Sequence, residues 1–138
     1  MDQKLELLKR VPLFSELDRR GLEALAQLTE EVKVEAGRVL MREGDIGDAF
    51  YVISDGSVRV ERGGKPVATL GQGDFVGEFA LVDHGPRTCT VTTDTPASLF
   101  VLGHREFHAL LDSYPGVAKQ VLIGLALRVR QLQPLPVT

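Results

Sequence analysis

The sequence predicts a mainly β domain with helices at both ends, an α+β chain whose centre is a sandwich, a barrel or a jelly roll. Helical periodicity runs through residues 1–29 and returns in residues 103–133. Between these segments, short alternating apolar and polar runs are separated by glycine or proline at intervals of roughly eight to twelve residues, which is typical of all-β folds. We therefore expect one domain over residues 1–138, with about eight strands between the helical segments.

Two helices are expected within residues 1–29. The first spans Gln3 to Arg10, and Pro12 separates it from the second because proline has no backbone N–H with which to continue a helix. The second helix follows Ser15, where apolar residues recur at helical spacing: Leu22, Leu25, Ala26 and Leu28. This spacing predicts an amphipathic helix.

Strands are expected over residues 30–102, where the hydrophobic period changes from about 3.6 towards 2. The expected strands lie at residues 32–34, 39–41, 49–53, 57–62, 66–70, 88–93 and 97–102. Two glycine-containing pairs, Asp55-Gly56 and Gly63-Gly64, separate consecutive strands. Such pairs favour hairpin turns because glycine adopts positive φ without steric cost.

Helical periodicity returns at residues 103–111 and again from about residue 117 to residue 132, with Pro134 and Pro136 ending the last helix. Apolar residues of the last helix alternate at steps of four and three, the spacing of a coiled-coil seam: Ala118, Leu122, Leu125, Val129 and Leu132. Two explanations stay open, which are a homodimer interface through this helix and packing of the helix against its own β-region.

Charge and composition exclude several classes of protein. Sixteen basic and nineteen acidic residues give a net charge of -3 without a Lys/Arg cluster, so direct nucleic-acid binding is not expected. The most apolar stretch, residues 117–127, contains Lys119 and is too short for a membrane span. Cys89 is the one cysteine, and residues 1–10 mix charges among their apolar residues, which favours a reducing, cytoplasmic protein. An alternating strand around Cys89 suggests a buried apolar role for it.

One segment carries residues suited to binding chemistry. Residues 73–81 enter a helical turn from a glycine-rich loop, so that free backbone N–H groups can point at an anion. Arg87 follows with a planar fork of donors suited to two oxygens of one phosphate. Glu78, when ionised, only accepts hydrogen bonds, which suits a sugar hydroxyl. Together they predict a ligand in which a phosphate and a free hydroxyl lie close together, as in a ribose 3',5'-cyclic phosphate.

The run Phe75-Val76-Gly77-Glu78-Phe79-Ala80-Leu81, followed by Pro86-Arg87-Thr88, resembles the phosphate-binding cassette of the cyclic-nucleotide-binding domain family. That family includes catabolite activator proteins, regulatory subunits of cyclic-AMP-dependent protein kinase and cyclic-nucleotide-gated channels. The resemblance places the cassette at residues 73–90 and implies these ligand-binding residues: Gly77, Glu78, Phe79, Ala80, Leu81, Pro86, Arg87 and Thr88. It implies that Glu78 binds the ribose 2'-hydroxyl, that Arg87 binds the exocyclic phosphate oxygens, and that Thr88 bears on the choice of base.

The resemblance also implies a jelly-roll-like β-roll and a regulatory function. The expected ligand is cyclic AMP, or else cyclic GMP, with no metal and no cofactor. The C-terminal helix would act as a hinge and lid over the base, and Val121, Leu122 and Leu125 are the candidate lid contacts. No catalytic or DNA-binding module is visible in the sequence, so we expect a sensor that is not an enzyme and that signals to an unidentified effector protein.

Two alternatives compete with this hypothesis. The first is a degenerate domain that keeps the cassette but acts only in dimerisation or protein interaction. The second is a cupin-like metal enzyme, to which His84, His104 and His108 could contribute ligands. No second cluster of His, Asp or Glu at ligand spacing supports a metal site, so these histidines are expected to be surface residues.

Overall fold

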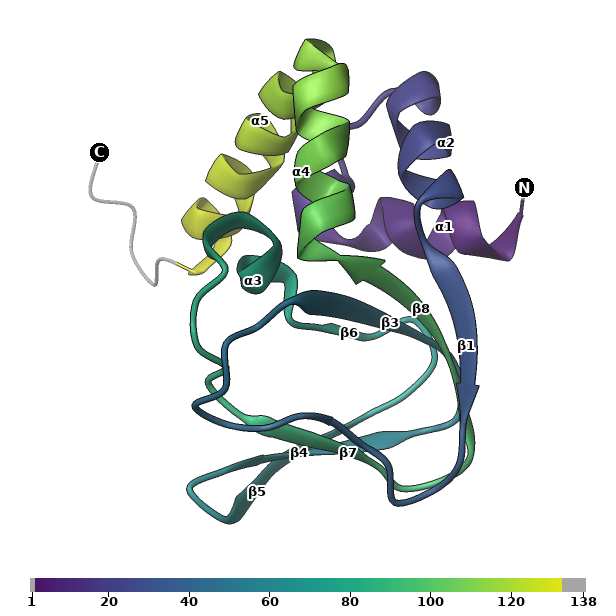
Figure 1. Cartoon of the computed structure of the whole chain (residues 1–138), viewed down its shortest axis with the longest axis vertical. Helices are drawn as coiled ribbons and strands as arrows, with labels where there is room; N and C mark the ends of the chain where they lie inside the picture. The colour runs from purple at the N-terminus through teal and green to yellow at the C-terminus, as the bar shows by residue number, and fades with distance from the viewer. Residues whose placement is uncertain (1, 133–138) are drawn as a thin grey trace.

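The computed structural model describes residues 2–132 and shows two antiparallel four-stranded sheets that face each other as a β-roll (Figure 1). The strand orders are β1-β8-β3-β6 and β2-β7-β4-β5. The strands are β1 (Glu30–Val34), β2 (Val39–Met41), β3 (Ala49–Asp55), β4 (Val58–Arg62), β5 (Lys65–Leu70), β6 (Phe75–Val76), β7 (Thr90–Thr93) and β8 (Ala97–Gly103). The predicted jelly-roll-like fold with flanking helices is confirmed.

The two central strands of the first sheet, β3 and β8, are covered on both faces. Because side chains alternate along a strand, Phe50 and Val52 face one way while Ile53 faces the other. The first pair belongs to a core shared with the helices, whereas Ile53 belongs to a core shared with the second sheet. Strand β8 divides in the same way, with Leu102 in the helical core and Leu99 between the sheets. The first sheet is therefore the middle layer of three.

Helices from both ends of the chain form the outer layer on the first sheet (Figure 1). They are α1 (Gln3–Arg10), the 3-10 turn η1 (Pro12–Phe14), α2 (Arg19–Gln27), α4 (His104–Ser113) and α5 (Pro115–Leu132). The Phe14 ring meets the Phe50 ring edge-on at a centroid distance of 5.6 Å and lies 5.9 Å from the Phe107 ring. These aromatic contacts join the N-terminal helices, the sheet and the C-terminal helices into one core.

Helix α5 lies close against the backbone of η1 at Gly124. A Cβ atom at Gly124 would lie 2.8 Å from each of the carbonyl oxygens of Pro12 and Leu13, so only glycine allows this approach. One turn earlier, Val121 is buried in the helical core. The contacts of Val121 and Gly124 therefore fix the position of α5 at its middle, and its last turns extend past η1.

The element boundaries depart from the sequence-based expectation at several elements; for example, β1 begins at residue 30 instead of 32, and β7 begins at residue 90 instead of 88. Helix α2 begins at Arg19, because the Asp18 side chain accepts a hydrogen bond from the Gly21 N–H and caps the helix there. Helix α5 begins at Pro115, since proline is compatible with the first position of a helix. The two-residue strand β6 was not predicted. The expected stops at Pro134 and Pro136 lie outside the described residues.

Within residues 2–132, none of the helices combines the length and the apolar character that crossing a membrane requires.

Candidate functional site

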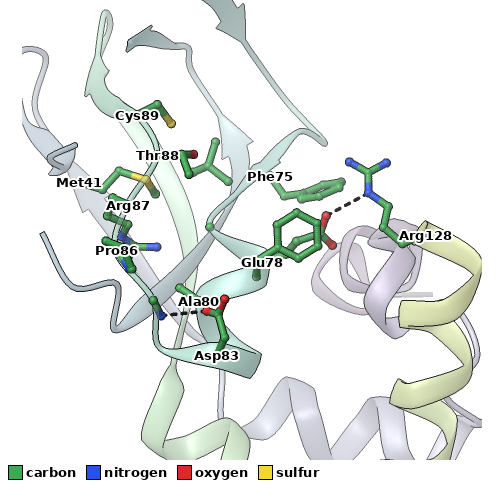
Figure 2. A pocket seen from close by; sticks show the side chains of 14 residues that line it. Met41, Phe75, Glu78, Ala80, Asp83, Pro86, Arg87, Thr88, Cys89 and Arg128 are labelled. Atoms are coloured by element: carbon green, nitrogen blue, oxygen red, sulfur yellow. Dashed lines mark hydrogen bonds and ion pairs between the residues drawn. The ribbon is translucent and has the colours of Figure 1, made fainter. Parts of the chain in front are cut away.

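A pocket of about 360 Å³ opens between the β-roll and the helical layer. Its walls come from the segment around β6 and α3 (Glu78–Asp83), from residues 85–89, from Met41 on β2 and from Arg128 on α5 (Figure 2). The pocket thus brings together the two halves of the predicted cassette, and it adds one residue from the C-terminal helix.

The left-handed conformation of Gly77 determines how the chain enters α3. Its φ is 86°, a region that side-chain-bearing residues rarely adopt. A Cβ atom here would also lie 2.6 Å from Arg87 Nη1 and 3.1 Å from the Ala49 carbonyl oxygen. Glycine is therefore required both by the turn and by the approach of the Arg87 guanidinium group. No side chain caps the start of α3.

Arg87 is buried at the base of the pocket, with 8% of its surface exposed. Its Nη2 donates a hydrogen bond of 2.6 Å to the Ala49 carbonyl oxygen on β3. Its backbone is fixed to the loop between β2 and β3, because Arg87 N donates to Asp45 O and Gly44 N donates to Arg87 O. The other terminal nitrogen, Nη1, is buried and has no hydrogen-bond partner within residues 2–132. One donor group of the fork is thus available in the pocket.

Glu78, the first residue of α3, is also buried, with 5% of its surface exposed. Its Oε1 lies 3.3 Å from Arg128 Nε, whereas its Oε2 has no hydrogen-bond partner within the described part of the chain. Burial raises the pKa of the Glu78 carboxyl above its ordinary value, and the nearby Arg128 charge opposes this only in part. An acceptor oxygen thus lies unused in the same pocket as the Arg87 donor.

Comparison with known proteins explains this arrangement. The family model for the cyclic nucleotide-binding domain matches residues 31–114. The chain belongs to this family.

Individual relatives agree with this membership. The cAMP-dependent protein kinase regulatory subunit of Schizosaccharomyces pombe is 39% identical over 108 residues, which are 78% of this chain and 26% of the relative. The chain thus spans about a quarter of the length of this curated relative. The N-terminal domain of a transcriptional regulator from Streptomyces coelicolor superposes with a TM-score of 0.82 at 36% identity, covering 91% of this chain and 93% of that one.

A third similar protein is the regulatory domain of Toxoplasma gondii PKA, whose structure was solved with cAMP. It superposes with a TM-score of 0.72 at 34% identity and covers 78% of this chain and 43% of the other. These comparisons agree that the chain contains a cyclic nucleotide-binding domain.

Seven of the eight predicted ligand-binding residues of this domain line the pocket. Gly77, Glu78, Phe79, Ala80, Pro86, Arg87 and Thr88 all contribute to its wall. The eighth, Leu81, is fully buried in the helical core and does not line the pocket. Residues three apart lie near the same face of a helix, so Leu81 packs into the core beside the pocket wall to which Glu78 contributes.

The three candidate lid residues of the domain lie away from the pocket in this structure. Val121 is buried in the helical core, Leu125 packs against the same core, and Leu122 is exposed to solvent. The residue of α5 that reaches the pocket is Arg128, which sequence reasoning missed (Figure 2). Arg128 is one heptad after Val121, so it lies near the same face of α5 as Val121. Because an apolar lid was expected, a charged residue was not considered.

The three histidines, which were expected only to be surface residues, lie together. His104 and His108 on α4 are half-buried, and His84 follows the end of α3. Within residues 2–132, no group of three or more His, Cys, Asp or Glu side chains is placed to hold a metal ion. Cys89, which is half-buried on the pocket wall, packs against the core between the two sheets.

The raised pKa of Glu78 predicts how the stability of the ligand-free domain depends on pH. A carboxyl whose folded pKa exceeds its unfolded pKa holds more protons in the folded state, so its unfavourable contribution grows as pH rises from about 4.5 towards the raised value. We expect Glu78→Gln to raise the melting temperature at pH 7, and this gain to shrink as the pH approaches 4.5. Thermal unfolding followed by circular dichroism at several pH values measures it; a gain that stays constant with pH would exclude the titration of Glu78 as its cause.

Proposed function

We propose that the pocket binds a cyclic nucleotide, most favourably cyclic AMP and otherwise cyclic GMP, and that the chain acts as a regulatory sensor. One observation carries this proposal. Arg87 Nη1 and Glu78 Oε2 are two buried, ionisable groups of opposite charge, both without a partner within residues 2–132, and both residues line one pocket. A buried polar atom without a partner costs roughly 1–3 kcal/mol, so a ligand that bonds both atoms removes two penalties.

The ligand must offer an anion to Arg87 and a hydrogen-bond donor to Glu78. A phosphate oxygen suits the guanidinium group, and a ribose hydroxyl can donate to the carboxylate. In a cyclic nucleotide, the ring holds the phosphate and the 2'-hydroxyl on one rigid frame, so little conformational freedom is lost when both bonds form. The cAMP in the structure of the Toxoplasma relative supports this choice of ligand.

Two residues of the pocket wall, Thr88 and Arg128, are available to contact the base of the ligand. Thr88 is exposed on the pocket wall, so its hydroxyl is accessible to a phosphate or to a base edge. Arg128 is the residue of α5 that reaches the pocket, and its guanidinium plane can stack on either purine. We propose cyclic AMP as the physiological ligand, with base discrimination resting on few contacts.

The layered fold supports the proposed regulatory role. The N-terminal helices, the first sheet of the β-roll and the C-terminal helices share a core, which supports the proposal of a single functional unit over residues 1–138. We propose that this unit has no catalytic activity and signals to an effector protein. The alternative is an interaction module, and an exposed apolar face of α5 supports it: Leu122, Ile123, Leu127, Val129 and Leu132 are all exposed. A homodimer formed through this face is compatible with both functions.

Titration calorimetry with cyclic AMP, cyclic GMP and 5'-AMP tests the proposed function. We expect both cyclic nucleotides to bind, and 5'-AMP to bind at least tenfold more weakly because its phosphate carries an additional charge and is not held by the ring. Binding of the linear and cyclic forms with equal affinity would contradict the cyclic-phosphate assignment. No binding of any of the three, together with a dimer in analytical ultracentrifugation, would favour the interaction module.

A further inference from the structure

The C-terminal end of α3 is held by side chains from another helix. Helix α3 has six residues, and its Ala80 carbonyl oxygen accepts a hydrogen bond of 3.1 Å from the N–H of His84, the residue after the helix. A carbonyl oxygen has two lone pairs and can accept a second hydrogen bond. His104 Nδ1 lies 2.9 Å from the Ala80 carbonyl oxygen, and His108 Nε2 lies 2.7 Å from the Leu81 carbonyl oxygen. Since a carbonyl oxygen only accepts, each of these ring nitrogens must carry the hydrogen and donate it. Two imidazoles on successive turns of α4 therefore bond two successive carbonyls of α3.

The imidazole rings also support one another. The His84 and His104 rings are stacked with centroids 4.3 Å apart, and the His104 and His108 rings lie 4.1 Å apart. His84 follows α3 directly and has a φ of 53°, the one positive value of a non-glycine residue within the described chain. The three rings form a column that begins at the end of α3 and continues along α4. This column fixes the orientation of the two donor nitrogens.

The carbonyls that the column holds lie next to the pocket residues. Ala80 is two residues after Glu78 on α3. A Cβ atom added at Gly47 would lie 2.6 Å from the Ala80 Cβ atom. The added Cβ atom would also lie 3.0 Å from the Arg87 guanidinium carbon. Ala80 is therefore packed into the loop beside Arg87 while its carbonyl is bonded to α4. A shift of α3 along or away from α4 would change the distance between the Glu78 carboxylate and the Arg87 guanidinium group.

We infer that His104 and His108 are positioning residues of the nucleotide pocket, which hold α3 so that Glu78 and Arg87 face one ligand at the same time. They do so through their hydrogen bonds to the Ala80 and Leu81 carbonyls, and neither lines the pocket itself. This inference rests on the proposed function. It assigns a role in ligand binding to α4, which lies outside the cassette.

Paired substitutions separate the hydrogen bonds from the packing. The double variant His104→Leu with His108→Leu keeps bulk on α4 but removes both donors. The variant His104→Asn with His108→Gln restores them, because the Asn amide nitrogen takes the place of Nδ1 and the Gln amide nitrogen that of Nε2. Arg105→Leu, an exposed neighbour on α4, is the matched control.

We expect the double leucine variant to bind cyclic AMP about tenfold more weakly in calorimetry, since two hydrogen bonds that orient the site are lost. The Asn/Gln variant should return to within about threefold of the parent affinity, and Arg105→Leu should match the parent. Equal affinities of the leucine variant and the parent would overturn the inference. So would failure of the Asn/Gln variant to recover affinity while its melting temperature recovers. The single variant His108→Leu repeats the test if the double variant does not fold.

Hydrogen exchange of the ligand-free proteins provides a readout that does not depend on ligand binding. Amides of residues 78–84 should exchange faster in the leucine variant and at the parent rate in the Asn/Gln variant. If the parent binds no cyclic nucleotide, the proposed function fails, but this exchange pattern still reports whether α4 holds α3. Unchanged exchange in the leucine variant would overturn the inference even where the parent binds cyclic AMP.

Discussion

Arg87→Ala is expected to abolish cyclic AMP binding in titration calorimetry, with affinity reduced at least a hundredfold. A hydrogen bond to a charged group contributes roughly 1.5–3 kcal/mol, and the substitution would also leave the buried phosphate without its counter-charge, which costs more than leaving a neutral group unpaired. Together these losses exceed the roughly 2.8 kcal/mol that a hundredfold change requires. The guanidinium group is also prepared for binding, because its Nη2 is already fixed to the Ala49 carbonyl oxygen while Nη1 has no partner among the described residues. Its removal therefore deletes an oriented donor.

Two further variants sharpen this test. Arg87→Lys keeps the charge but loses the planar fork, so its affinity should lie between those of the parent and of Arg87→Ala. Arg59→Ala removes an arginine of β4 that pairs with Glu61 and Asp94 outside the pocket, and it should bind as the parent does. Unchanged affinity of a folded Arg87→Ala protein would refute the assignment of the phosphate to Arg87.

Two glycines of α5 should respond to alanine in opposite directions. Gly124→Ala is expected to lower the free energy of unfolding by about 1–3 kcal/mol, because the new Cβ would lie 2.8 Å from two backbone carbonyl oxygens of η1 that cannot rotate away. Gly116→Ala is expected to leave it unchanged or raise it by up to about 1 kcal/mol, since nothing lies within 4 Å of the new atom and alanine favours a helix. Urea denaturation measures both.

The comparison of the two glycines controls for helix propensity. Both substitutions improve the intrinsic propensity of α5, so a loss of stability confined to Gly124→Ala must come from its contact with η1. Equal effects of the two substitutions would show that α5 is not held by this contact. Displacement of α5 would also move Arg128 away from Glu78, so Gly124→Ala should change nucleotide affinity and Gly116→Ala should not.

The sequence was most informative where one local pattern decides the structure. The alternation in β4, with Val58 and Val60 buried and Arg59 exposed, predicts its strand because one face must be apolar and the other solvated. Glu78 and Arg87 lie close together in the sequence, so one short segment brings both residues to the pocket wall. By contrast, the two residues of β6 are too few to show a period, and pairing with β3 alone makes them a strand.

The parts that sequence reasoning missed depend on contacts between distant elements. Arg128 lines the pocket only because Gly124 lets α5 approach η1, and no local pattern reports that distance. The histidine column joins His104 and His108 of α4 to His84, which follows α3, and His84 is too far away in the sequence for any local pattern to report this contact. Both features follow from tertiary packing, which a hydrophobic period cannot specify.

The three-layer arrangement has a mechanical consequence for the pocket. Arg87 is anchored to the sheet side, through Ala49 and the loop before β3, whereas Glu78 is paired with the helical side through Arg128. The helical layer and the second sheet have separate cores and are joined through the sheet between them. A ligand bonded to both Arg87 and Glu78 would therefore connect the helical layer to the β-roll. A force on α5 would then be transmitted to the β-roll through the ligand itself.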